Sequence, residues 1–93
     1  MSFMPRFALG RTVVTRTCLA AMQELNVNPN TYLMRHWSCD WGDLTNEDKQ
    51  ANELALERGD RLLSKYEIQG MEAIYVISEA DRSATTMCLV SEY

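Results

Sequence analysis

The feature that most constrains the fold is a change in hydrophobic period just after Gly59. Between residues 62 and 68, apolar or small side chains alternate with more polar ones, which is typical of a strand with one solvated face. Residues 73–77 are apolar on both faces and predict a central strand. Residues 85–90, after a polar turn, predict a third strand. The last third of the chain therefore predicts a three-stranded antiparallel meander.

The residues before Gly59 show helical spacing with good helix caps at the expected ends. The first predicted helix begins at Thr15 or Thr17 and ends near Asn26, the second begins at Asn28-Pro29 and runs to about Trp37, and the third begins at Thr45, with Asp48 as partner in a capping box, and ends at Gly59. In the third helix, Ala51, Leu54, Ala55 and Arg58 form one stripe, flanked by Asn52 and Leu56.

These patterns predict an α+β fold in two layers. Its sheet is expected to be antiparallel and three- or four-stranded, with two or three helices on one face. Residues 7–15 are predicted as a short strand or an extended arm. The chain of 93 residues is expected to be a single domain, residues 1–93, with residues 1–6 as a flexible arm.

Charge is unevenly distributed along the chain, whose formal net charge is −4. Residues 1–35 carry +3, residues 36–60 carry −5 and residues 61–93 carry −2. An acidic protein repels nucleic acid, so direct nucleic-acid binding is not expected, whereas the middle segment is suited to a basic partner. No apolar run approaches the length of a membrane span, and no secretory signal is recognised, so a cytoplasmic location with no membrane contact is expected.

The stretch from Arg35 to Leu44 holds the single histidine and both tryptophans. His36 falls on the apolar arc of the second helix and has two interpretations. It is either a general base or ligand oriented by Asp40 or Asp43, or a buried structural histidine bonded to the following turn. The structural interpretation is favoured, because a single histidine on an apolar arc usually has that role.

Metal binding and nucleophilic catalysis find little support in the spacing of the reactive residues. Cys18 and Cys88 are too far from His36 and Cys39 in the sequence to make the paired short spacings of zinc modules. Ser64, Ser83 or Cys39 lack the flanking motif of an activated nucleophile. No metal, no cofactor and no catalytic residue is therefore predicted, and the three cysteines are expected to be free thiols.

Two further features are candidates for binding. The turn at residues 79–83 contains Asp81 and Arg82, which either hold an anionic ligand or pair within the turn. Trp37 is expected in the core and Trp41 at the rim, where it can anchor a protein partner together with the acidic residues Glu53 and Glu57.

Several blocks of residues resemble a poorly characterised family of small accessory proteins encoded on plasmids and integrative elements, some of which carry automatic labels linking them to type I restriction-modification systems. The blocks are Phe7-Ala8-Leu9-Gly10, His36-x-x-x-Asp40-Trp41-Gly42-Asp43-Leu44, Asp48 with Asn52, Gly59-x-Arg61-Leu62-Leu63-Ser64-x-Tyr66, and Glu79-Ala80-Asp81-Arg82-Ser83-x-Thr85-Thr86. Glycine usually stands in the family where this chain has Cys39. The chain lacks a glycine-rich cofactor loop, so the resemblance does not imply a methyltransferase.

The resemblance implies an accessory protein of a mobile element that binds a macromolecular partner, such as a host defence protein or a DNA-processing protein, and inhibits it. One alternative is a small ligand-binding protein or enzyme with a pocket built from His36, Asp40, Asp43 and Arg82. Another is a structural subunit of a larger complex.

Overall fold

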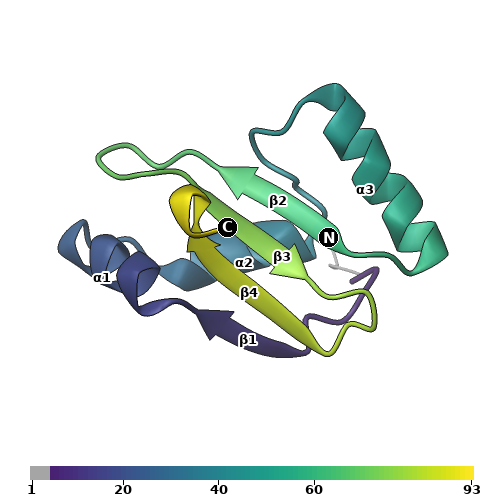
Figure 1. Ribbon diagram of the computed structural model, residues 1–93, viewed down its shortest axis with the longest axis horizontal. Coiled ribbons are helices and arrows are strands. Elements are labelled where there is room, and N and C mark those ends of the chain that lie inside the picture. The colour runs from purple at the N-terminus through teal and green to yellow at the C-terminus, as the bar shows by residue number, and fades with distance from the viewer. Residues whose placement is uncertain (1–4) are drawn as a thin grey trace.

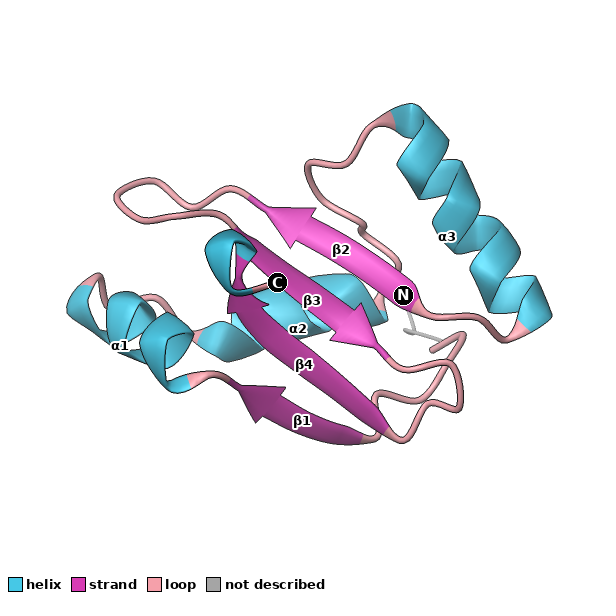
Figure 2. Ribbon diagram, in the orientation of Figure 1, coloured by secondary structure: helices cyan, strands magenta, loops and turns pink. Residues whose placement is uncertain are grey.

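The computed structural model describes residues 5–93, which fold as a four-stranded sheet with three α-helices (Figures 1 and 2). In chain order the elements are β1 (Arg11–Val14), α1 (Arg16–Glu24), α2 (Pro29–Trp37), α3 (Asn46–Arg58), β2 (Leu62–Tyr66), β3 (Ile74–Ser78), β4 (Ala84–Leu89) and the short 3₁₀ helix η1 (Val90–Glu92). The predicted α+β class is confirmed. The predicted arm lies largely outside the described residues, although Arg6 of that segment forms an ion pair with Glu53 at 2.9 Å.

The C-terminal meander is confirmed, with strand order β1-β4-β3-β2. Strand β3 lies between β2 and β4 and pairs with both in antiparallel register, Val76 lying opposite Ser64 on one side and Met87 on the other. Alternate residues of each strand point to the same face of the sheet, so Ser64, Val76 and Met87 share one buried face.

The N-terminal strand joins the sheet, but the sheet is mixed and the expectation of a purely antiparallel sheet is wrong. Strand β1 runs parallel to β4, with Val13 opposite Thr86. The pairing brings the ends of both strands together, where the Thr15 hydroxyl donates to the Glu92 carboxylate at 2.7 Å. A link between residues 77 positions apart is not visible in the local pattern that predicted the strand.

The predicted helix ends are confirmed where side chains cap them. Thr15 accepts from the Cys18 N–H, Asn28 from the Asn30 N–H and Thr45 from the Asp48 N–H. Gly59 ends α3 in the left-handed conformation, at φ 74°.

Helices α1 and α2 cover one face of the sheet, and α3 lies alongside the edge formed by β2 (Figure 1). The main core between the sheet and α1 and α2 consists of Cys18, Met22, Leu33, Tyr66, Ile68, Ile74, Val76, Met87 and Leu89. A smaller cluster joins α3 to the edge through Trp41, Ala55 and Leu62. Two helices, α1 and α2, therefore lie on one face of the sheet, within the expectation of two or three, and α3 lies beside its edge.

The inward face of α3 differs from the predicted stripe. Asn52 and Ala55 are buried, whereas Leu54, which the stripe placed inward, is 48% exposed. The reason is that α3 packs against the polar edge of a strand. Asn52 can hydrogen-bond that edge, and a leucine at the same position cannot.

Candidate functional site

His36 is completely buried between α2 and the sheet, as the apolar arc of the second helix indicates. Its Nδ1 lies 2.6 Å from the Ser64 hydroxyl on β2, and its Nε2 lies 2.9 Å from the Ser78 hydroxyl on β3. The expected partners, Asp40 and Asp43, do not contact the ring. The two serines that replace them stand 28 and 42 residues away in the sequence.

Ser64, His36, Ser78 and Thr85 form a chain of hydrogen bonds, and the Thr85 hydroxyl at its end fixes the direction of each bond. The Thr85 hydroxyl donates to the carbonyl of Leu9 at 2.7 Å, so it can only accept from Ser78, which lies 2.7 Å away. Ser78 then donates to Thr85 and accepts from His36 Nε2–H. The remaining ring nitrogen, Nδ1, accepts from Ser64. His36 is therefore a neutral imidazole with its proton on Nε2, and both ring nitrogens are satisfied.

Burial, with a smaller contribution from the charge of Arg82, lowers the pKa of His36 from 6.5 to about 4. Because the histidine of the unfolded chain takes up a proton below pH 6.5 and the folded one does not, stability is expected to fall as the pH drops from 6.5 towards 4. The shift corresponds to a loss of about 3 kcal/mol. Urea unfolding at several pH values checks this, with His36→Gln as the control. Identical pH profiles for both proteins between pH 4 and 6.5 would contradict it.

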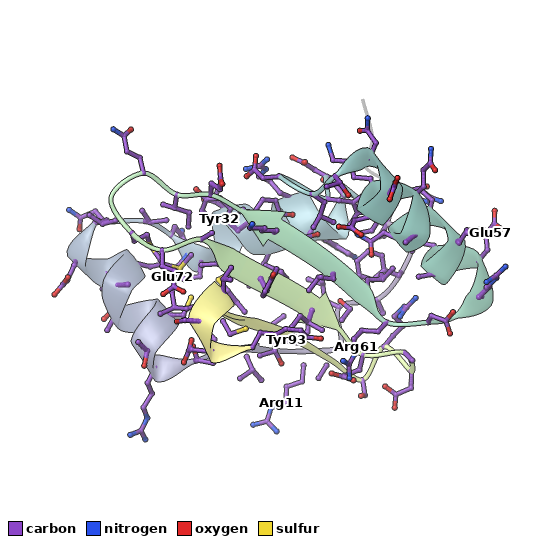
Figure 3. All side chains as sticks on the ribbon, turned by 45° about the horizontal axis from the view of Figure 1, so that its top comes forward. Arg11, Tyr32, Glu57, Arg61, Glu72 and Tyr93 are labelled. Atoms are coloured by element: carbon purple, nitrogen blue, oxygen red, sulfur yellow. The ribbon has the colours of Figure 1, made fainter. Side chains whose placement is uncertain are left out.

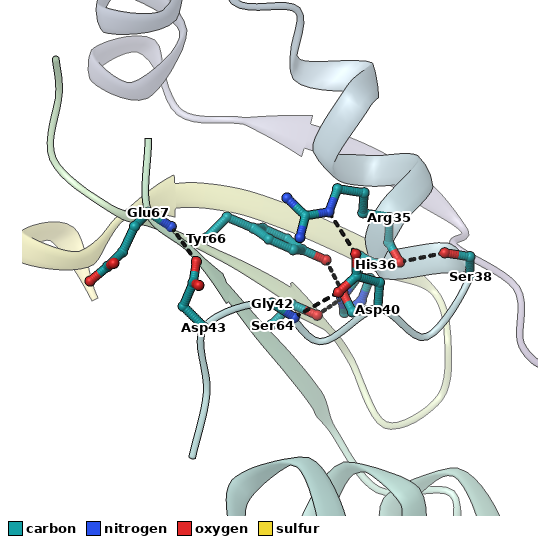
Figure 4. A network of polar contacts seen from close by, with 9 residues as sticks. All are labelled: Arg35, His36, Ser38, Asp40, Gly42, Asp43, Ser64, Tyr66 and Glu67. Atoms are coloured by element: carbon teal, nitrogen blue, oxygen red, sulfur yellow. Dashed lines mark hydrogen bonds and ion pairs between the residues drawn. The ribbon is translucent and has the colours of Figure 1, made fainter. Parts of the chain in front are cut away.

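The block Asp40-Trp41-Gly42-Asp43 lies along the outer edge of β2, where Gly42 pairs with Lys65; Figure 4 shows Asp40, Gly42 and Asp43 of this block. The Asp43 N–H donates to the carbonyl of Lys65 at 2.7 Å, and the Lys65 N–H donates to the carbonyl of Trp41. The Asp43 carboxylate accepts from the Glu67 N–H at 2.8 Å. Further along the edge, the Asn52 amide exchanges both of its hydrogen bonds with the backbone of Leu63. Side chains and one short extended segment thereby hydrogen-bond the outward backbone N–H and C=O groups of β2, which would otherwise be unpaired at the sheet edge.

Asp40 belongs to the same block but faces solvent. Its carboxylate accepts from the Arg35 guanidinium at 2.7 Å, which holds the pKa of Asp40 below its ordinary value. Its carbonyl accepts from the Tyr66 hydroxyl at 2.5 Å, and Arg35 also lies over the Tyr66 ring. Asp40 therefore joins α2 to β2.

The two tryptophans have roles opposite to those expected. Trp41 is buried, with 4% of its surface exposed, and its indole N–H donates to Glu53 at 2.9 Å. Trp37 is half-buried and donates to the carbonyl of Phe7. Helical periodicity placed Trp37 inward, but Trp41 packs with Leu62 and Ala55 under α3, a contact that sequence spacing does not reveal. Trp41 is therefore unsuited to anchor a partner, and Glu53 is bound by both Trp41 and Arg6.

The Arg82 side chain hydrogen-bonds to backbone carbonyls. Its guanidinium donates to Asp60 at 2.7 Å and to Glu79 at 2.9 Å, and contacts Ala55 and Ala80. It thus ties the 79–82 turn to the C-terminal end of α3, where a cation is favourable. Asp81 accepts from the Ser83 N–H within the turn. The arrangement corresponds to the structural interpretation of this turn.

The residues proposed for a ligand pocket do not converge. His36 is bound to serines inside the molecule, Asp40 and Asp43 serve the block on the β2 edge, and Arg82 clamps a turn. Residues 5–93 form no pocket, and no group of three His, Cys, Asp or Glu side chains among them is placed to hold a metal ion. Cys18 and Cys88 are buried thiols and Cys39 is half-buried.

The outer face of α3 is one surface that these structural roles leave free. We define it by Glu47, Gln50, Leu54 and Glu57, which are spaced so that they share one side of the helix. All four are exposed, and Glu57 points away from the body of the protein in Figure 3. Sequence reasoning identified Glu57 but placed Leu54 in the opposite stripe of the helix, with Ala55. The signal that could have corrected it is Asn52, whose amide suits a strand edge.

Comparison with known proteins finds no match to a family model, to a curated protein or to a solved structure. In the part of the chain that the structure covers, no helix has the length and apolar character needed to cross a membrane.

Proposed function

We propose that this chain is a cytoplasmic accessory protein of a mobile genetic element that binds a macromolecular partner through the outer face of α3 and inhibits a host defence or DNA-processing protein. The observation that carries the proposal is the exposed Leu54, flanked by Glu47 and Glu57 on a helix whose opposite side is held to the β2 edge by Asn52. A rigid helix with an apolar residue at the centre of its free face is suited to bind a complementary groove.

Charge supports a basic partner. Residues 36–60 carry −5, and within this segment Glu47, Asp48 and Glu57 have no hydrogen bond or ion pair to side chains elsewhere in the described chain. A positively charged channel for nucleic acid offers the matching surface. Binding there would block the channel without any chemistry.

The resemblance to accessory proteins of mobile elements supports the context. The resembled family usually has glycine at position 39, and Cys39 adopts φ 66°, a left-handed conformation that favours glycine. The backbone at this position is therefore consistent with the family pattern, even though the residue differs.

A capture experiment tests the proposal. The tagged protein is used to retain partners from a lysate of cells that carry a restriction system. We expect a basic nucleic-acid-binding protein to be retained, to be released by high salt, and to be displaced by added duplex DNA, because DNA competes for the same surface. Leu54→Ala combined with Glu57→Lys is expected to reduce capture at least about tenfold, as central anchors do.

Glu24→Lys is the matched control, because it makes the same charge change on the exposed end of α1. It is expected to retain the partner. Capture that survives the α3 variant, or that is lost equally in the α1 variant, would argue against the α3 surface. No retained protein, or a retained protein that DNA does not displace, would argue against inhibition of a nucleic-acid channel.

A further inference from the structure

The two edges of the sheet differ in how their backbone groups are satisfied. At the β2 edge, Asn52 and the 40–43 block occupy the outward groups of Leu63, Lys65 and Glu67. At the other edge lies β1, and no segment of the described chain covers its outer side (Figure 1). A strand with unpaired backbone groups is a template for pairing with another strand.

The pairing of β1 with β4 shows which backbone groups face outward. The N–H groups of Arg11 and Thr15 donate inward, to the carbonyls of Ser83 and Met87. Because backbone groups alternate along a strand, those of Thr12 and Val14 point away from β4. The extended segment therefore offers two outward residues, with Val13 between them.

We infer that the chain forms a homodimer by antiparallel pairing of β1 with β1 of a second copy, with Val13 opposite Val13 of the second copy. In this register Thr12 lies opposite Val14 of the second copy, and their outward backbone groups exchange hydrogen bonds. The extended segment runs from Arg11 to Thr15, since Gly10 before it has φ 66° and α1 follows it. Val13 is the centre of that segment, so this register uses its whole length.

Side chains favour a second copy as the occupant. Val13 is 38% exposed on the face of the sheet away from α2, and opposing residues of an antiparallel pair share a face, so the two valines cover each other. The same register places Arg11 opposite Thr15 of the second copy, whose hydroxyl donates to Glu92. Arg11 has no ion pair within residues 5–93 and points away from the protein in Figure 3. Two Arg11–Glu92 pairs would thus form across the dimer axis.

The dimer would join two four-stranded sheets into one continuous sheet. Because α3 lies beside β2, at the edge opposite β1, both α3 outer faces would remain free at the two ends of the assembly (Figure 1). The pairing is short, so the association is expected to be weak and dependent on concentration.

Sedimentation equilibrium of the full chain tests the inference. Between about 10 µM and about 1 mM, the mass is expected to rise from that of the 10.7 kDa monomer towards twice that value, following mass action. Val13→Lys alone and Val13→Glu alone should each remain monomeric, because like charges meet at the axis. An equal mixture of the two variants should dimerise, because Lys then faces Glu. This rescue is specific to a register that pairs position 13 with itself.

Two further variants keep the test decisive. Thr12→Pro removes an outward N–H, which an edge strand tolerates, and should abolish dimerisation while circular dichroism is unchanged. Leu54→Lys makes the same kind of change as Val13→Lys on α3 and should dimerise like the wild type. A monomeric wild type at about 1 mM would overturn the inference, as would failure of the charge-swapped mixture to dimerise or loss of the dimer in Leu54→Lys.

Discussion

Gly42→Ala is expected to destabilise the protein by about 3–5 kcal/mol, from left-handed strain, overpacking and the loss of edge hydrogen bonds. Gly42 has φ 77°, and a Cβ at this position would collide with the carbonyl of Lys65 and lie 2.6 Å from the Tyr66 ring. The clash would move the segment off β2 and break the bonds that Trp41 and Asp43 make with Lys65. For a domain of this size, whose total stability is about 5–14 kcal/mol, the loss is a large fraction.

Gly59→Ala is the matched control for this experiment. Gly59 has a similar φ of 74°, but a Cβ there would meet nothing within 4 Å. The control therefore isolates the backbone strain, which costs about 1–2 kcal/mol. Urea denaturation of both variants measures the difference. Equal losses of stability at positions 42 and 59 would mean that close packing of Gly42 against β2 contributes nothing. The 40–43 block would then not stabilise the β2 edge.

Local signals in the sequence predicted the elements well, because their causes are local. The caps Thr15, Asn28 and Thr45 each bind a backbone N–H two or three residues ahead, and Gly59 ends its helix by its own conformation. The alternation along β2 reflects one buried face, which no distant residue needs to specify. These features could be predicted because the residues that create them lie close together in the sequence.

The remaining features depend on contacts that spacing does not encode. Strand β1 pairs in parallel with β4, and Thr15 at its end contacts Glu92 near the opposite end of the chain. Trp41 is buried because α3, which follows it, folds back over it and supplies Glu53 to its indole N–H. Leu54 is exposed because Asn52 occupies the inward position. None of these three features follows from apolar periodicity, because each involves a polar contact with another part of the structure.

The motif residues that suggested a functional site have roles in the fold. Gly42 and Asp43 bind the β2 edge, Asn52 continues that seal, and Arg82 fastens a turn to the end of α3. Residues that stand out in the sequence can therefore have purely structural roles. Because these residues have roles in the fold, the proposed binding surface lies on Leu54 and Glu57, outside the blocks that carry the resemblance.

His36→Ala is expected to lower the free energy of unfolding by about 3–5 kcal/mol, combining an internal cavity with an unpaired hydroxyl. The ring is completely buried and joins α2 to two strands through Ser64 and Ser78. Removing it leaves Ser78 one partner, Thr85, but deprives the Ser64 hydroxyl of its ring acceptor. Phe7 and Trp41 also lose their edge contacts with the imidazole. The expected loss of stability is therefore larger than the loss caused by removing one surface hydrogen bond.

A double-mutant cycle with Ser64→Ala distinguishes the hydrogen bond from the cavity. Ser64→Ala alone leaves Nδ1 unpaired and should cost about 1–3 kcal/mol. The double variant His36→Ala with Ser64→Ala should cost less than the sum of the single variants, because neither partner is then left buried without the other. Urea unfolding at pH 7 measures all four proteins. A His36→Ala loss below about 1 kcal/mol, or strictly additive losses, would show that the buried hydrogen-bonded chain does not hold α2 to the sheet.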